Sequence, residues 1–359
     1  MAENKPTVVV TGISGNLGLR LLPQLSGFNV VGVDLKPPAS DALTRFESID
    51  LGEEASCREM LLLLREARAV AVVHLAFVID PIRTNVLDSD RMWHINVAGT
   101  ARVMEAITEA NRDETLVQKF IFPSSVSAYG PDLPGPVTED FPLGAHTLPY
   151  AIHKMESDKV VQLRAPALRG CSAYMLRPHI LAGASVENYL LGAFRGTPNG
   201  GGVRAARMRE RGARLPCMLP YGQKYLDHKI QFVHVDDAAR LIAHILRKSE
   251  PEAQRLTILN VAGRGESLTF ERCIQMAHAK LWRAPSKYAF RLALQAYWKL
   301  GISAIPPEAW PYMTGQYIMS TDRLQKFLGS NYDDVIRFTV TDAFADSFPD
   351  SGAETGQNT

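Results

Sequence analysis

The chain has 359 residues, of which 46% are hydrophobic and 21% charged, and its 39 Lys and Arg almost balance its 38 Asp and Glu. This composition indicates a globular protein of one large domain or two closely packed ones, and it excludes fibrous and disordered classes. A net charge of +1 argues against a broad nucleic-acid-binding surface.

The spacing of the cysteines and the length of the apolar runs indicate in which cellular compartment the protein is expected. The four cysteines, at positions 57, 171, 217 and 273, form no CxxC pair, which argues against a metal site or a disulfide framework. Residues 1–5 are polar and lead directly into a strand-like run, so we expect no signal peptide. The longest apolar run, 69–79, contains a histidine and is too short to cross a bilayer. We therefore expect a cytoplasmic protein with no membrane span, no metal and no nucleic-acid partner.

From residue 7 onward, continuous β-branched runs alternate with longer amphipathic stretches, the pattern of buried parallel strands joined by crossover helices. The predicted strands are 7–10, 29–33, 69–75, 119–123, 172–177, 230–233 and 256–260. The predicted helices are 17–25, 53–66, 89–110, 150–164 and 236–247. Pro23 is expected to disturb the second half of the first helix. We predict an α/β fold with a Rossmann-type doubly wound parallel sheet and a smaller, discontinuous C-terminal region.

Three later segments depart from this pattern. Residues 195–214 hold six arginines, five glycines and one glutamate, which predicts a long charged loop, either a lid over a ligand or a mobile insertion. Residues 287–302 place Phe290, Leu294, Tyr297 and Leu300 at helical spacing. We expect this stripe to pack on a core rather than to touch a membrane surface. Residues 349–359 are small and polar, and we expect them to be disordered.

A glycine-rich turn follows the first predicted strand, with the sequence TGISGNLG from Thr11 to Gly18. Glycines let the backbone turn tightly and approach a pyrophosphate, while the next helix offers free N–H groups. The second predicted strand ends in Asp34, 22 residues after Gly12, where a carboxylate accepts hydrogen bonds from a ribose and repels a 2′-phosphate. We therefore expect NAD, with NADP disfavoured, although Lys36 weakens the preference. The alternative is a turn that serves only helix packing. The predicted contacts are Gly12, Ser14, Gly15, Asn16, Leu17, Gly18 and Asp34.

Two further strand ends are candidate cofactor contacts, because ligands of open α/β sheets bind at the carboxyl ends of strands. Asp50 and Leu51 follow a possible third strand, and HLAF at 74–77 ends the next one. We predict that Asp50, Leu51, Leu75, Ala76 and Phe77 lie near the adenine and ribose. Asp50 alone is almost as well explained as a solvated loop acid. His74 is expected to be a core histidine.

The strand 119–123 leads to Ser125, and 25 residues later come Tyr150 and, at i+4 on one helix face, Lys154. A free phenol has a pKa near 10, so proton transfer at neutral pH requires a shift of about three units, roughly 4 kcal/mol. An ammonium at about 4 Å supplies a Coulomb energy of that size. We therefore predict Tyr150 as general acid/base, Lys154 as the group that lowers its pKa, and Ser125 as a substrate contact. A second match to this spacing, Tyr225 and Lys229, is expected to be surface residues.

In chain order these motifs resemble the extended short-chain dehydrogenase/reductases, the NAD-dependent epimerase/dehydratase family. The resemblance spans about residues 7–262 and rests on five motifs. They are TGISGNLG with Asp34, HLAF, NVAGT from Asn96, SSVSAYG with YAIHK, and LRP followed by FVHVDD at 232–237. It implies that Ser125, Tyr150 and Lys154 are the catalytic triad and that Lys154 also touches the nicotinamide ribose. It places Asn96 near the cofactor or a bound water; the alternative is a helix-interior side chain bonded to backbone. Pro178 completes the expected cofactor-binding set.

The resemblance also implies a division of the chain. Residues 1–177, with 230–262 returning to the sheet, would form the NAD-binding domain. Residues 178–229 and 263–348 would form the substrate-binding region, followed by the tail 349–359. Helices 89–110 and 150–164 lie where family members form a four-helix dimer interface, so we expect a homodimer.

Departures from the family pattern bear on the substrate. Sugar-nucleotide epimerases have an asparagine and an arginine for the diphosphate at the places of Ile180 and Ile230, and an isoleucine cannot donate to a phosphate. The Asp-Glu pair of the sugar-nucleotide 4,6-dehydratases is Val126-Ser127 here. Arg177-Pro178 instead resembles members that act on less polar substrates, such as hydroxysteroid dehydrogenases and dihydroflavonol reductases.

Three functional hypotheses follow. The first is reversible hydride transfer between nicotinamide and a secondary alcohol or ketone, with Tyr150 exchanging the proton. The second is a sugar or sugar-nucleotide epimerase that retains its NAD, and the third is a dinucleotide-sensing protein without turnover, which the intact triad disfavours. His179 is expected to be structural rather than a second acid/base. Asp236 is expected to cap a helix, and neither it nor His234 is assigned chemistry.

Overall fold

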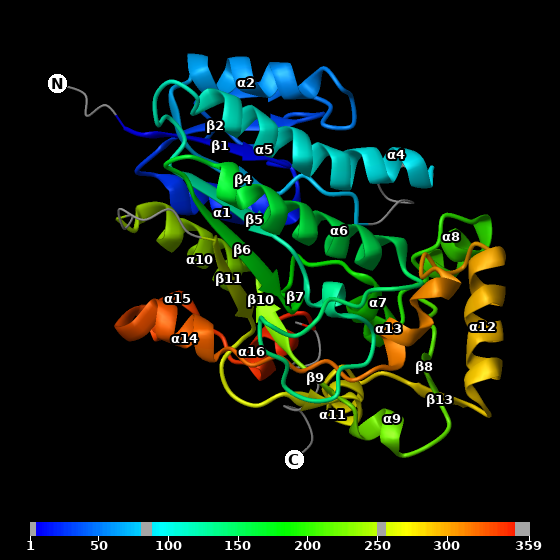
Figure 1. Ribbon diagram of the computed structural model, residues 1–359. Coiled ribbons are helices and arrows are strands. Elements are labelled where there is room, and N and C mark those ends of the chain that lie inside the picture. Colours follow the sequence, from blue (N-terminus) through cyan, green and yellow to red (C-terminus); the bar gives the residue numbers. More distant parts are fainter. Residues whose placement is uncertain (1–4, 80–87, 250–255, 349–359) are drawn as a thin grey trace.

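The computed structural model describes residues 5–79, 88–249 and 256–348. Its centre is a seven-stranded parallel sheet in the order β11-β6-β5-β4-β1-β2-β3 (Figure 1). The strands are β1 (Thr7–Thr11), β2 (Asn29–Asp34), β3 (Arg45–Ser48), β4 (Ala69–His74), β5 (Lys119–Pro123), β6 (Ser172–Pro178) and β11 (Leu256–Val261). This order confirms the predicted doubly wound α/β fold, with its reversal point beside β1.

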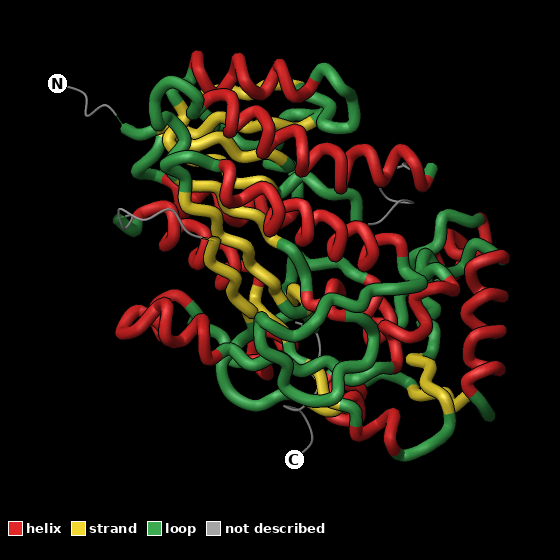
Figure 2. The backbone as a smooth tube through the Cα atoms, in the orientation of Figure 1, coloured by secondary structure: helices red, strands yellow, loops and turns green. Residues whose placement is uncertain are grey.

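Helices cover both faces of the sheet, as the layers in Figure 2 show. One face carries α2 (Ser56–Glu66), α5 (Gly99–Ala110) and α6 (Pro149–Arg164), and the other carries α1 (Asn16–Leu21), α10 (Val235–Arg247), α14 (Asp322–Leu328) and α15 (Tyr332–Val335). Along β1, Val8 and Val10 pack into the core on the face of α1 and α10, while Val9 packs into the core on the face of α2, α5 and α6. Burial on both faces explains why this strand is hydrophobic throughout.

Two predicted elements differ in detail. The helix predicted at 17–25 ends at Leu21, and a 3₁₀ turn, Leu22–Leu25, follows around Pro23, as expected for a residue without an N–H. The strand predicted at 230–233 is wrong, because it divides into β9 (Lys229–Ile230) and β10 (Phe232–His234), both outside the main sheet. Gln231 separates them, since its side chain accepts from Met319 N at 2.8 Å and donates to Met319 O at 3.2 Å.

The remaining elements form a second body beside the carboxyl ends of the strands (Figure 1). Its strands pair as β10 with β7 (Ile180–Ala182), β9 with β12 (Leu268–Thr269), and β8 (Cys217–Pro220) with β13 (Leu281–Ala284). Its helices are α7 (Tyr189–Arg195), α8 (Val203–Glu210), α9 (Lys224–Asp227), α11 (Phe270–Met276), α12 (Lys287–Lys299), α13 (Trp310–Thr314) and α16 (Val340–Ala345). They surround a core that includes Phe194, Phe270, Phe290 and Phe344.

The prediction of one long loop at 195–214 is wrong, because the segment contains α8 and buries Ala205. Backbone hydrogen bonds hold the glycines before this helix, Gly200 N to Ile302 O and Gly202 N to Gly301 O, each at 3.0 Å. The segment is therefore tied to the end of α12. That helix forms as predicted and buries Phe290 and Leu294, but Leu300 follows its last residue and is 43% exposed, so the predicted stripe is only partly packed on the core.

No helix of the described residues is long and apolar enough to cross a membrane. The tail predicted at 349–359 lies outside the described residues.

Candidate active site

Each of three glycines in the turn after β1 has a separate structural role. Gly12 has φ +69°, and a Cβ there would lie 2.4 Å from Ala76 N. A Cβ on Gly18 would lie 2.4 Å from Ile13 O, so this glycine lets α1 pack on the turn. Gly15, in contrast, is exposed, and its Cβ would meet only Gly12 O, at 3.2 Å. The geometry thus leaves open space at Gly15, where a pyrophosphate has room to approach the backbone.

Asp34 lies beside this turn at the end of β2. Its two carboxylate oxygens accept hydrogen bonds from Ser14 N at 3.0 Å and Leu35 N at 2.8 Å. The Ser14 hydroxyl donates to Lys36 O, and the Lys36 side chain is exposed. Asn16, the first residue of α1, donates to Ser185 O at 2.7 Å, which joins the turn to the loop after β7. A carboxylate therefore stands where the sequence predicts a ribose contact, and these residues fit a dinucleotide.

The other two candidate cofactor contacts follow β3 and β4, which lie on opposite sides of β1 in the sheet. Asp50 is not a free loop acid: one carboxylate oxygen accepts from Gly52 N at 2.9 Å and the other pairs with Arg91. Leu51 is buried, and its carbonyl accepts from Arg102 at 3.0 Å.

The residues after β4 are tied to Thr11, which ends β1. Leu75 N donates to Thr11 O at 3.0 Å, and Ala76 N donates to the Thr11 hydroxyl at 3.3 Å. His74 is fully buried between Thr11 and Thr100, with ring nitrogens 2.7 and 3.0 Å from the two hydroxyls. Burial lowers the His74 pKa to about 3, so this imidazole is neutral and belongs to the core.

Ser125 and Tyr150 meet where β5 ends and α6 begins. Pro149 opens α6, a position where its missing N–H costs nothing, so Tyr150 falls in the first helical turn. The Ser125 hydroxyl accepts from Ser127 N at 3.1 Å and hydrogen-bonds the Tyr150 side chain. Burial raises the pKa of the phenol, and the bond to Ser125 opposes that rise. The protein alone thus shifts the Tyr150 pKa in the direction opposite to the one the sequence predicts.

Lys154 lies one turn further along α6 and is buried. Its ammonium donates to Pro123 O at 2.7 Å and lies 3.6 Å from the centre of the Phe77 ring. Burial lowers the pKa of Lys154 to about 7, against the opposing charge of Asp158. The Phe77 ring also meets Tyr150 edge-on, with ring centres 5.9 Å apart. Phe77 therefore contacts both side chains of the predicted acid/base pair.

Asn96 lies in a π-helical turn, His94–Ala98, between α4 (Ser89–Trp93) and α5. Its side-chain oxygen accepts from Val78 N at 2.6 Å, and its amide donates to Val78 O at 3.1 Å and lies 3.3 Å from His153 Nδ1. These contacts match the alternative of a helix-interior side chain bonded to backbone. Asn96 fastens the chain after β4 to the helix layer, and π-helical turns often occur at functional sites.

A buried polar network next to Ser125, Tyr150 and Lys154 was not predicted from the sequence. Arg177 on β6 forms two hydrogen bonds with Asp158 on α6, at 2.8 and 3.0 Å, and donates to Tyr129 Oη at 2.8 Å. Asp158 also accepts from Ser124 at 2.8 Å, and Tyr129 donates to Asn260 at 2.7 Å. Two features of the sequence could have indicated it: Arg177 is a charged residue in an apolar strand, and Asp158 is a second charged residue four positions after Lys154. The network fixes α6 relative to β5, β6 and β11.

Pro178 and His179 mark the end of β6. Pro178 pairs with Val261 of β11. His179 is buried, accepts from Ile180 N at 2.8 Å and lies 3.3 Å from Tyr317 O. Burial lowers its pKa to about 3, so the expected structural role agrees with the geometry.

The expected cap at Asp236 is wrong, because His234 caps α10 by accepting from Asp236 N. The other ring nitrogen of His234 lies 3.0 Å from Asp346. Tyr225 belongs to the short helix α9 and Lys229 to strand β9, so this second Tyr and Lys share no helix face.

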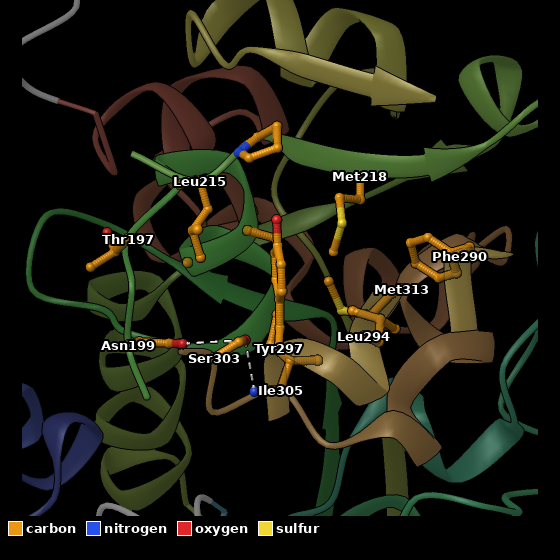
Figure 3. A pocket seen from close by; sticks show the side chains of 14 residues that line it. Thr197, Asn199, Leu215, Met218, Phe290, Leu294, Tyr297, Ser303, Ile305 and Met313 are labelled. Atoms are coloured by element: carbon orange, nitrogen blue, oxygen red, sulfur yellow. Dashed lines mark hydrogen bonds between the residues drawn. The ribbon is translucent and has the colours of Figure 1, made fainter. Parts of the chain in front are cut away.

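A pocket of the second body lies between α7, β8, α12 and α13 (Figure 3). Its cavity volume is about 40 Å³, and none of its fourteen lining residues is charged. Met218, Phe290, Leu294 and Met313 supply apolar walls, and the Asn199 side chain faces Ser303 at one side. Tyr312, next to Met313 of the pocket wall, accepts from His146 N at 3.2 Å and donates to its carbonyl at 3.0 Å, which ties α13 to the loop before α6.

Ile180 and Ile230, the two places where a diphosphate contact is missing, both pack on the core of the second body. Ile230 is fully buried, and neither side chain offers a hydrogen bond.

The fold and this cluster at the carboxyl ends of the strands define a Rossmann-type protein. The model of the NAD dependent epimerase/dehydratase family matches residues 8–262. The UDP-glucose 4-epimerase of Bacillus subtilis (strain 168) is 32% identical over 166 residues, 43% of this chain and 47% of that protein. The UDP-glucose 4-epimerase of Drosophila melanogaster is 25% identical over 259 residues, 65% and 70% of the two chains. The solved UDP-glucuronic acid 4-epimerase of Bacillus cereus, in complex with UDP-glucuronic acid and NAD, superposes with a TM-score of 0.63 at 17% identity, covering 96% of each chain.

The chain belongs to the NAD dependent epimerase/dehydratase family. This confirms the predicted family. The chain matches only about half of the length of the Bacillus subtilis relative.

Proposed function

We propose that this protein is an NAD-dependent oxidoreductase that interconverts a secondary alcohol and a ketone. The observation that carries the proposal is the cluster of Ser125, Tyr150 and Lys154 at the carboxyl ends of β5 and its neighbours. NAD supplies the hydride acceptor for alcohol oxidation and, when reduced, the donor for ketone reduction. All other chemistry in the site is proton transfer and positioning by the chain itself.

Each member of the cluster has a role that follows from its contacts. Tyr150 exchanges the proton with the substrate oxygen, and Ser125, already bonded to the phenol, holds the same oxygen. We propose that Lys154, whose ammonium contacts the same Phe77 ring as Tyr150, supplies a positive charge to the site and a donor for the nicotinamide ribose. Its buried position and its bond to Pro123 O fix that charge in place. We propose the predicted set as the cofactor-binding residues, with Asn96 acting by holding Val78.

The substrate we propose is less polar than a sugar nucleotide. The pocket in Figure 3 has no charged residue with which to hold a diphosphate. Ile180 and Ile230 offer no donor. Apolar walls with a few polar groups are typical of sites for hydrophobic small molecules.

The second candidate is an epimerase that keeps its NAD through the cycle. It is favoured by the similarity to the UDP-glucose 4-epimerases of Bacillus subtilis and Drosophila melanogaster. The first of these matches covers 43% of this chain and 47% of that protein.

The two candidates separate when freshly purified protein is denatured and the released dinucleotide is measured per chain. Little or no bound NAD supports a dissociable cosubstrate and a dehydrogenase, and secondary alcohols and ketones are then screened for NAD-linked turnover. Close to one NAD per chain, together with conversion of a UDP-sugar, contradicts the proposal and supports the epimerase.

We also propose the predicted division, with residues 1–177 and 230–262 binding NAD and the second body binding substrate, except that β9 and β10 belong to the second body. A cytoplasmic location agrees with four cysteines that are all free. A homodimer through α4, α5 and α6 is supported by two exposed apolar side chains on these helices, Trp93 and Leu163. Light scattering at micromolar concentration tests the dimer, and a monomeric mass contradicts it.

A further inference from the structure

Charge is distributed very unevenly along this nearly neutral chain. Residues 188–223 and 272–307, here called the basic lobe, hold twelve Lys and Arg but a single acid, Glu210. The other residues hold 27 Lys and Arg against 37 Asp and Glu. The net charge of +1 therefore hides a strongly positive region beside a negative remainder.

The two segments of the basic lobe lie together in space. Strand β8 of the first pairs with β13 of the second, and Gly200 and Gly202 donate to Ile302 O and Gly301 O. Figure 1 shows α8 and α12 at the same edge of the molecule, on the side away from the sheet. The lobe is thus one continuous surface region.

Six cations of this region are exposed and form no ion pair with a carboxylate of the described residues. They are Arg204, Arg207 and Arg211 on or next to α8, and Lys287, Arg291 and Lys299 on α12. Unpaired charges of one sign produce a field that attracts an anionic partner.

Bulky apolar side chains stand among these cations. Tyr288 and Leu292 on α12 are 72% and 65% exposed, and Val203, the first residue of α8, is 69% exposed. The opposite face of α12 is covered, because Phe290 and Leu294 are buried. The outer face of α12 therefore combines positive charge with exposed apolar surface.

We propose that the basic lobe docks on the surface of an anionic lipid bilayer, with α12 in the plane of the interface. Lys and Arg attract anionic headgroups, and Tyr and Leu gain free energy by entering the boundary between headgroups and acyl chains. A nucleic-acid backbone would satisfy the cations but would leave Leu292 and Val203 without apolar contacts. The combination of charge and apolar exposure therefore favours a membrane surface.

Docking in this orientation has a consequence for the pocket. Phe290, Leu294 and Tyr297 line the pocket from the covered side of α12, whose outer side faces the lipid. An apolar substrate dissolved in the bilayer would then be concentrated next to its binding site. This consequence rests on the proposed function, whereas the docking itself does not.

The test is co-sedimentation of the full chain with phosphatidylcholine vesicles that contain or lack phosphatidylserine. We expect binding to the anionic vesicles only, weakened by added salt. The triple variant K287E/R291E/K299E should lose roughly tenfold or more of its binding. The control R58E/R169E/K326E makes the same charge change at exposed sites outside the lobe and should bind like the original protein.

A second pair of variants tests the apolar contribution. Leu292→Ser should weaken vesicle binding severalfold, whereas Leu62→Ser, at an exposed leucine on α2, should leave it unchanged. Unaltered NAD binding by every variant confirms that each is folded. Equal binding by the two triple variants overturns the proposal. So does binding to duplex DNA or RNA without binding to vesicles. Because none of these assays measures turnover, a failure of docking is distinguishable from a failure of the proposed reaction.

Discussion

The sheet region and the basic lobe treat positive charge in opposite ways. Beneath the triad Arg177 is buried and bonded to Asp158, and the ammonium of buried Lys119 donates to the carbonyls of Ile245 and Leu246. In the basic lobe, cations such as Arg291 and Lys299 are exposed on α12. A charge inside a protein is tolerated only where the fold supplies its partners, whereas an exposed charge is available to another molecule. The contrast separates the region that we propose holds the reaction geometry from the one that we propose docks on a membrane surface.

The largest expected effect concerns the chemistry of the first region. Tyr150→Phe removes the proton donor and leaves the ring that meets Phe77. We expect turnover to fall by about 10³-fold, within the usual range for a general acid/base, while NAD binding is retained. Steady-state kinetics and a fluorescence titration with NADH measure the two properties. Full activity in this variant sinks the proposed mechanism.

The buried ion pair of Arg177 and Asp158 should make a large contribution to the stability of the sheet region. Arg177→Met leaves the Asp158 carboxylate buried, with the neutral side chains of Ser124 and Gln162 as its remaining hydrogen-bond donors. We expect a loss of about 3–5 kcal/mol in the free energy of unfolding, because a buried charge loses its counter-ion. Urea denaturation measures it.

The matched control for this change is Arg68→Met, which removes an exposed pair with Glu114. It should cost less than about 1 kcal/mol. Similar losses in the two variants would contradict the contrast between buried and exposed charge.

Much of the sheet region could be predicted because local pattern determines it. Continuous β-branched runs give β1 and β4, and the i, i+4 rule brings Tyr150 and Lys154 to one helix face. The glycine turn and Asp34 were identified for the same reason, since their roles depend on short-range geometry. What sequence could not show is the Arg177 and Asp158 pair, because it joins a strand to a helix through tertiary packing alone.

The second body was harder to predict because its elements are short and weakly patterned. The helix α8 has little apolar character, and it is held by backbone bonds between Gly202 and Gly301, far apart in the sequence. The division of 230–233 depends on Gln231 contacting Met319, which no local signal reveals. The direction of the Tyr150 pKa shift was missed because the sequence argument included the charge of Lys154 but not desolvation.

A pH dependence of stability should come from Lys154. Its pKa is about 7 in the folded protein against 10.5 for an ordinary lysine, so between these values the unfolded chain binds more protons. Stability contributed by this site therefore rises as the pH rises through that window, and it is lowest below pH 7. Lys154→Met should flatten the dependence by about 5 kcal/mol across the window.

Urea unfolding at a series of pH values measures this slope. Lys159→Met, an exposed lysine on the same helix, provides the control and should leave the slope unchanged. If the slope of Lys154→Met equals that of the original protein, the ammonium is not desolvated as the structure indicates.

The smallest expected effect lies on the outer face of the basic lobe. Leu292→Ala removes a side chain that is largely exposed, so the free energy of unfolding should change by no more than about 0.5 kcal/mol. Leu294→Ala, two residues along the same helix, removes a buried side chain and should cost about 2–5 kcal/mol. Urea denaturation of the two variants compares the faces directly. A large loss of stability for Leu292→Ala would mean that the exposed face of α12 is needed for folding. This face would then not be free to contact another molecule, and the contrast between the sheet region and the basic lobe would fail.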